Sequence, residues 1–190
     1  MSTKENHNVA SSSPSVRLGG AFIVLLRGIN VSGKNKIPMA DVRELLNNLD
    51  FQNVQTYIQS GNIILESDLE KDEICDKIKN GIQERFGFDV PVLARTILEW
   101  KKVIDNYPFS IENEKIVALT FLNKSTKETT IEVKNIGEDS YKIVEDVVYL
   151  YCPSGFGSTK LTNNIIERKL DVVATTRNLR TTLKLLELAQ

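Results

Sequence analysis

The sequence predicts an α+β protein whose N-terminal half has the ferredoxin-like order βαββαβ and packs on a second α+β half that ends in two helices. Three observations support this prediction. An almost wholly apolar run at 21–27 precedes a loop rich in Gly and Lys and then a segment of helical periodicity. Two strand-like runs, 53–59 and 62–66, flank a hairpin turn at Ser60-Gly61. A second helical segment then leads into an extended run at 90–95.

The elements of the first half follow from their residue patterns. The 21–27 strand is apolar at nearly every position, which is typical of a strand covered on both faces. The helix at 38–48 presents one apolar stripe to the core, made of Val42, Leu45, Leu46 and Leu49. We expect a second helix to begin near Ser67 or Asp68, where several carboxylates suit the positive end of the helix dipole, and to stop at Gly87.

The second half repeats the order strand, helix, strand, strand. A capping box at 96–99 opens a third helix, which runs to about residue 106. A strand at 115–122 is followed by a second capping pattern at 125–128, which predicts a short helix to about residue 134. A hairpin then pairs 140–144 with 147–151. No matching residues link the two halves, so the repetition is one of topology only.

Three parts of the chain are expected. Residues 1–20 form a polar, Ser-rich leader without hydrophobic periodicity, which predicts disorder. Residues 21–95 form the ferredoxin-like subdomain, and residues 96–190 form the second subdomain. In this second part, 154–160 lead into a helix that ends at about residue 170, and 174–178 lead into a last helix. The C-terminal segment is locally basic.

Composition excludes several classes of function. The formal net charge of −1 in 190 residues argues against a protein that coats nucleic acid or membrane through its overall field. No apolar run approaches a membrane span and no signal segment opens the chain, so we expect a cytoplasmic protein. The single histidine, His7, lies in the leader, which excludes a histidine-based triad or zinc site from the folded part. Cys75 and Cys152 have no metal-site spacing, and we predict no metal and no cofactor.

The βαββαβ order brings two loops to the same end of the sheet. If the first strand runs upward, the second returns upward and the third descends, so the 28–37 loop and the 60–61 turn share the upper end. We therefore expect one candidate ligand site in which residues of both loops meet. Its members are Arg27, Asn30, Gly33, Lys34, Asn35, Lys36, Gln59, Ser60, Gly61 and Asn62. The basic C-terminal helix starts add Lys160, Arg177, Asn178 and Arg180.

Two Gly-bearing loops suit an anion, GINVSGKNK in the first half and GFGSTK in the second. Each precedes a helix, where free N–H groups and the helix dipole favour negative charge. The first loop, GINVSGKNK, matches neither common phosphate-binding pattern, and a tight surface turn explains its residues equally well. Other members of the site have structural interpretations too, since Asn62 can cap the hairpin and Thr175 or Thr176 can be the N-cap of the last helix.

Three functions are compatible with these patterns. The leading hypothesis is a binding protein for a phosphate-bearing ligand, either a nucleotide or a nucleic acid. The alternative is a transferase or hydrolase acting on a phosphorylated substrate, which would need a lysine against a buried carboxylate. The third is a structural or oligomer-forming protein whose loops join the two halves, which would bury Lys34 and Arg177 against carboxylates of the opposite half.

Three separated motifs resemble a known bacterial family. LLRGINVSGKNKIPM, TYIQSGNIIL and GFGSTKLTNN followed by ATTRNLRTTLKLLELA are similar to domain of unknown function 1697 across 21–189. Members of that family read RGINVGGKN where Ser32 stands here, and GFGRSKLT where Ser158 stands here. The resemblance implies an α+β protein of two subdomains, the first of them ferredoxin-like. It implies no established activity and no catalytic residues.

Overall fold

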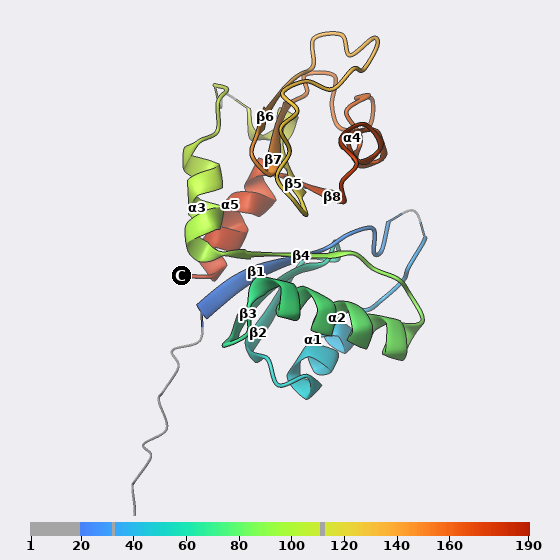
Figure 1. Ribbon diagram of the computed structural model, residues 1–190, viewed down its shortest axis with the longest axis vertical. Coiled ribbons are helices and arrows are strands. Elements are labelled where there is room, and N and C mark those ends of the chain that lie inside the picture. The colour runs from blue at the N-terminus through green and yellow to red at the C-terminus, as the bar shows by residue number, and fades with distance from the viewer. Residues whose placement is uncertain (1–19, 32, 111–112) are drawn as a thin grey trace, which may run out of the picture.

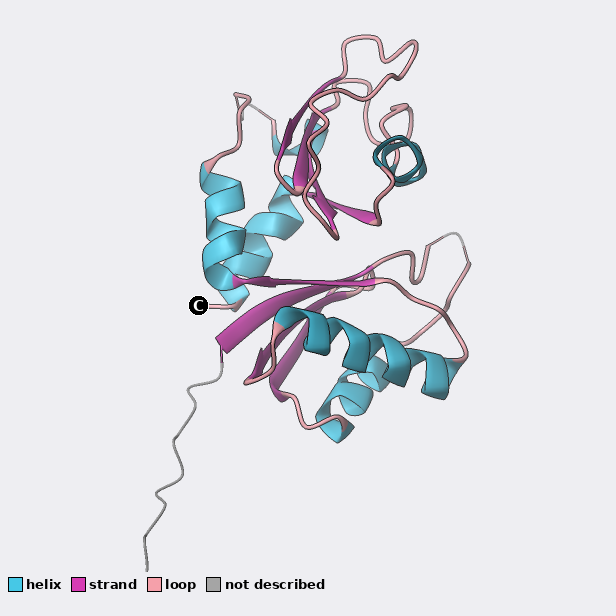
Figure 2. Ribbon diagram, viewed as in Figure 1, coloured by secondary structure: helices cyan, strands magenta, loops and turns pink. Residues whose placement is uncertain are grey.

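The computed structural model describes residues 20–31, 33–110 and 113–190 and confirms the α+β class (Figures 1 and 2). The expected leader, apart from Gly20, and Ser32 lie outside the described residues. The elements of the first half are β1 (Gly20–Leu26), α1 (Met39–Asn48), β2 (Gln52–Tyr57), β3 (Asn62–Ser67), α2 (Lys71–Phe86) and β4 (Val92–Thr96). Those of the second half are α3 (Ile97–Asp105), the 3₁₀ turn η1 (Glu114–Ile116), β5 (Val117–Leu122), β6 (Ser140–Val144), β7 (Val147–Tyr151), α4 (Asn163–Leu170), β8 (Ala174–Asn178) and α5 (Leu179–Leu188).

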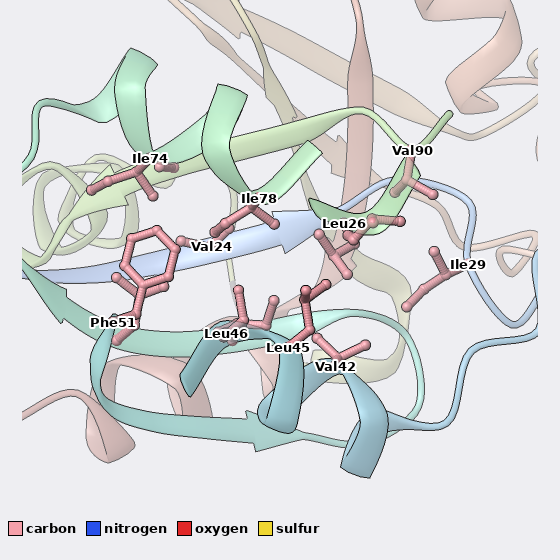
Figure 3. Close-up of a cluster of buried hydrophobic side chains, with 14 of the residues drawn as sticks. Val24, Leu26, Ile29, Val42, Leu45, Leu46, Phe51, Ile74, Ile78 and Val90 are labelled. Atoms are coloured by element: carbon pink, nitrogen blue, oxygen red, sulfur yellow. The ribbon is translucent and has the colours of Figure 1, made fainter. Parts of the chain in front are cut away.

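The first sheet has the antiparallel order β2-β3-β1-β4, which is the ferredoxin-like arrangement. Figure 1 shows α1 and α2 together on one face of this sheet. Figure 3 shows the core between them, where Val24 and Leu26 of β1 point toward Leu46 and Ile78 of the two helices. The intervening residues of β1 point to the opposite face, which is also covered, so this strand is buried on both faces as its apolar run predicts.

The second sheet repeats this order as β6-β7-β5-β8, with α4 on one face. The short helix expected after Ser125 is wrong, because 123–139 contain no helix or strand. The hydroxyl of Tyr141 accepts from Ile131 N at 2.6 Å and donates to Ile131 O at 2.9 Å. These bonds occupy backbone groups that a helix would need. The β-branched residues around Ile131 also have low helix propensity.

Helices α3 and α5 pack side by side between the two sheets (Figure 1). Trp100 of α3 stacks on Phe121 of β5 with ring centroids 4.4 Å apart, and its indole N–H donates to Thr182 O of α5 at 3.0 Å. Each of these two helices follows the last strand of its own sheet directly. One shared core therefore joins the two halves.

Several element ends differ from the sequence prediction. Strand β3 runs to Ser67, and α2 begins at Lys71, because the Glu73 carboxylate accepts from Glu70 N at 3.0 Å and caps the helix there. The capping box of α3 and the end of α2 at Gly87 are confirmed. Across the described ranges, no helix is long and apolar enough to span a membrane. The cytoplasmic location stays a prediction.

Candidate functional site

A cleft of about 940 Å³ lies between the 27–35 loop of the first half and α4 and β8 of the second. Lys34 and Ser60 both line it, so the two loops meet at one end of the sheet as the topology predicts. The second half supplies the opposite wall. Its lining residues are Thr162, Asn163, Asn164, Glu167, Val172, Val173, Thr175, Thr176 and Arg177.

Asn30 holds the loop of the first half in place. The residue has a φ of 54°, a conformation that asparagine tolerates better than most side chains. Its amide N–H groups donate to Ile37 O at 2.8 Å and to Gln59 O at 2.9 Å, and its Oδ1 accepts from Ile37 N at 2.8 Å. Asn30 thereby ties the loop to the β2–β3 turn, and its polar atoms are already used within the protein.

Arg27 links the two halves across the cleft. Its Nε and Nη2 atoms donate to the two carboxylate oxygens of Glu167, each at 2.6 Å, and Nη2 also donates to Asn164 Oδ1 at 2.8 Å. The hydrogen bonds that Arg27 donates to Glu167 raise the pKa of Arg27, against the opposing effect of burial. Glu167 also accepts from Ala174 N at 2.9 Å. The charge of Arg27 is therefore neutralised within the protein.

Arg177 is buried, with 7% of its surface exposed, and its guanidinium group crosses to the first half. Its Nη2 atom donates to Leu26 O at 3.1 Å, Ser60 O at 2.9 Å and Gly61 O at 3.3 Å, and its Nε atom donates to Asn62 Oδ1. Its Nη1 atom donates to Thr175 Oγ1 at 2.8 Å and to Thr176 O at 2.9 Å. All these acceptors are uncharged.

Burial lowers the pKa of Arg177 to about 10, so the group remains a cation at neutral pH. The carboxylates that line the cleft are already paired, Glu167 with Arg27 and Asp89 with Lys79 at 3.1 Å. Within the described part of the chain, neither Lys34 nor Arg177 forms a salt bridge. The cleft thus contains two positive charges that have no carboxylate partner among the residues that the structure describes.

The structure divides the predicted site residues into three groups. The cleft collects Arg27, Lys34, Asn35, Ser60 and Arg177. Two residues line neighbouring hollows, Lys160 and Asn178, and Asn178 also caps α5 by accepting from Thr181 N at 2.8 Å. The remainder do not line the cleft; they are Asn30, Gly33, Lys36, Gln59, Gly61, Asn62 and Arg180. Their participation in ligand binding stays a prediction.

Of the polar wall contributed by α4 and β8, sequence reasoning predicted Arg177 and missed the other residues. The sequence predicts Thr175 or Thr176 as the N-cap of the last helix, whereas both lie in β8 and the N-cap is Asn178. A signal was present, because four of the five residues from Val172 to Thr176 are β-branched, which favours a strand. Asn163 and Asn164 at the start of α4 carried no signal beyond an ordinary helix start.

Neither cysteine is an activated nucleophile. Burial raises the pKa of the Cys75 thiol to about 11, and burial also raises the pKa of Cys152, which contacts Thr159 Oγ1 at 3.6 Å. The thiolate, which is the reactive form, is therefore scarce at neutral pH.

A family model described as a protein of unknown function, DUF1697, matches residues 20–149. The chain belongs to this family. The matched residues include the first two motifs, which end at Leu65, but not the motif that begins at Gly155. No curated protein matches this DUF1697 chain.

A solved structure has the same fold. The conserved bacterial protein SP0830 from Streptococcus pneumoniae superposes with a TM-score of 0.69 at 22% sequence identity, over 90% of this chain and 99% of that one. At this level of identity the similarity concerns the fold alone.

Proposed function

We propose that this protein binds a phosphate-bearing ligand, a nucleotide or a nucleic acid, of which a part of nucleotide size occupies the cleft between its two halves. The observation that carries the proposal is the pair of cations, Lys34 and Arg177, that line the cleft without a carboxylate partner among the described residues. A buried, uncompensated cation is costly, and an anion nearby offsets that cost. The ligand therefore carries negative charge.

The two cations contribute in different ways. The N–H groups of Arg177 all have protein acceptors, so this residue supplies positive charge but no direct hydrogen bond. Lys34 is exposed at the cleft and free of described ion pairs, so its ammonium group can contact a phosphate. It is the residue whose loss tests the proposal most directly.

The opposite wall suits both the phosphate and the rest of a nucleotide. Asn163 and Asn164 occupy the first turn of α4, where backbone N–H groups lack intrahelical partners and the helix dipole favours an anion. The hydroxyl groups of Thr175 and Thr176 are hydrogen-bonded within the protein, so the side-chain N–H groups of Asn163 and Asn164 are the polar groups of this wall that suit a sugar or a base edge. The cleft volume lies within the range of small-molecule sites.

The test compares Lys34→Ser with Lys36→Ser. Both lysines are exposed and lie two positions apart in the same loop, but only Lys34 lines the cleft. Isothermal titration with pyrophosphate and with mononucleotides should show binding by the unmodified protein. Lys34→Ser should weaken it by about tenfold or more, because hydrogen bonds to charged groups contribute roughly 1.5–3 kcal/mol. Lys36→Ser should leave it nearly unchanged.

Two results would overturn the proposal. One is the absence of binding to every phosphate compound at low ionic strength. The other is equal weakening by the two substitutions, which would mean that the general charge of the loop, rather than the cleft, attracts anions.

A further inference from the structure

A second hollow, which we call the basic groove, lies beside α4. It has a volume of about 610 Å³ and is lined by Lys134, Lys160, Arg168, Lys169 and Glu132, with uncharged residues between them. The single carboxylate lies 3.9 Å from the ammonium group of Lys169. The groove therefore has an excess of three positive charges in a chain whose formal net charge is −1.

A third hollow, the aromatic hollow, contains Phe156. It has a volume of about 360 Å³, and Asn163, Thr176 and Asn178 are among its polar lining residues. Phe156 is 37% exposed, and it is the one aromatic among the exposed large apolar residues of the described part of the chain. The loop that carries it is held by Asp139, whose carboxylate accepts from Ser154 N at 3.2 Å and from Ser154 Oγ at 2.8 Å.

The three hollows meet at one residue. Thr162, the N-cap of α4, lines the cleft, the basic groove and the aromatic hollow alike. A ligand that occupies the cleft can therefore continue past Thr162 without leaving the surface. On one side it would meet a row of cations, and on the other an exposed aromatic ring.

We infer that the ligand of this protein is a single-stranded nucleic acid, with one phosphate in the cleft, the backbone continuing into the basic groove and a base against Phe156. This inference rests on the proposed function of the cleft. Repeated cations suit a repeated phosphate, and an aromatic face beside them suits base stacking, the combination used by proteins that bind single strands. A mononucleotide would leave the basic groove unused.

The first experiment measures affinity against ligand length. Fluorescence anisotropy with labelled RNA and DNA oligonucleotides of two to twelve residues should show affinity that rises with length. Short oligonucleotides should bind at least tenfold more tightly than a competing mononucleotide. Inorganic polyphosphate of equal charge should bind more weakly, because it offers nothing to Phe156.

The second experiment uses a matched pair of variants. Lys134→Ser/Lys160→Ser removes two cations of the basic groove, whereas Lys127→Ser/Lys142→Ser removes two exposed cations that line none of the three hollows. The groove variant should weaken oligonucleotide binding about tenfold. It should lower the slope of log affinity against log salt by about 1.4 if each lysine neutralises one phosphate of a single strand. Mononucleotide binding should not change.

Phe156→Ala should weaken the binding of oligonucleotides by roughly tenfold through lost stacking, with no effect on the binding of polyphosphate. Each failure has a separate meaning. Equal affinity for mononucleotide and oligonucleotide, or equal weakening by the two double variants, overturns this inference and leaves the cleft proposal standing. Tighter binding of polyphosphate than of oligonucleotide rejects nucleic acid as the ligand. No binding of any of these compounds overturns both proposals.

Discussion

In each half of the molecule an arginine side chain reaches across to the other half, but one of the two forms an ion pair there and the other does not. Arg95 is the last residue but one of β4, and Arg177 holds the same place in β8. Each lies opposite the first strand of its own sheet, Arg95 beside Ile23 and Arg177 beside Leu119. Each guanidinium group then crosses to the opposite half and donates to the carbonyl of the last residue of that half's first strand. Arg95 donates to Leu122 O of β5, and Arg177 donates to Leu26 O of β1.

The hairpins beyond these carbonyls account for the difference. Arg95 reaches the β6–β7 turn, where Asp146 Oδ2 lies 2.8 Å from its Nη2 atom. Arg177 reaches the β2–β3 turn, where it finds only the carbonyls of Ser60 and Gly61 and the amide of Asn62. Arg95 therefore forms an ion pair with the opposite half, whereas Arg177 lies beside the cleft without a carboxylate partner among the described residues. The two halves therefore differ at the β2–β3 turn, which has no carboxylate for the arginine, and the cleft beside this turn is where we propose that the ligand binds.

The largest expected effect comes from replacing Arg177, the arginine without a carboxylate partner. Arg177→Ala should lower the free energy of unfolding by about 3 kcal/mol, because several buried acceptors lose their donor. Arg95→Ala should lower it by only about 2 kcal/mol, since water can reach Asp146, whose side chain is 32% exposed. Urea denaturation of both variants measures the difference. A larger loss for Arg95→Ala would contradict the comparison.

Gly61 is the next test, because it lets the turn approach Leu26 at the end of β1, where the Gly61 carbonyl accepts from Arg177. Its φ is 75°, and a Cβ atom there would lie 2.6 Å from Leu26 Cβ. Gly61→Ala should therefore cost roughly 2 kcal/mol of stability or more, from the left-handed backbone and from the clash together. Gly155→Ala is the control, since its φ of 82° carries the same backbone cost but nothing lies near its Cβ. Equal thermal unfolding midpoints for the two variants would show that the close approach is unimportant.

The sequence predicts the first half better than the second for a physical reason. In 20–96, apolar periodicity, capping and turn residues agree with one another, so the ferredoxin-like order follows from local patterns. In the second half, the capping pattern at Ser125 competes with the bonds between Tyr141 and Ile131, which no local pattern reveals. The strand Ala174–Asn178 has β-branched residues that favour a strand, but the same residues also resemble a helix start, and pairing with β5 decides between the two.

The site was predictable only in part. The topology alone brings Lys34 near Ser60, because both lie at one end of the first sheet. The pairing of Arg27 with Glu167 spans 140 positions and depends on how the two halves pack. That packing also decides which cations keep a partner. Composition and spacing contain no information about it, so the charge of the cleft could not be predicted.

A carboxylate placed beside Arg177 should give this arginine an ion pair like that of Arg95 with Asp146. Thr175 Oγ1 accepts from Arg177 Nη1 at 2.8 Å, so Thr175→Asp gives this arginine a charged partner at the same place. Binding of pyrophosphate should weaken about tenfold, because the uncompensated charge is removed. Thr175→Asn, which has the same shape without the charge, should bind within about twofold of the unmodified protein. Equal titration curves for the two variants would mean that the charge of Arg177 does not contribute to binding.

The smallest effect concerns the connection between β7 and α4, where the second half has a long loop and the first half has only 68–70 between β3 and α2. Burial opposes ionisation of Asp139, but hydrogen bonds from Thr159 and Ser154 lower its pKa overall. The folded state therefore favours the carboxylate, and this stability is present above the ordinary pKa of 3.8 and is lost as the pH falls through the lowered value.

Asp139→Asn should cost about 1 kcal/mol at pH 7 through the weakened hold on Ser154. The difference from the unmodified protein should shrink as the pH falls below 3.8 and through the lowered pKa, where the folded carboxyl group of the unmodified protein becomes protonated and loses the same charge-assisted bonds. Urea denaturation at pH 7 and at steps down to pH 3 measures it. A difference that is constant with pH would show that shape, rather than charge, makes Asp139 hold the loop that carries Phe156 and Lys160.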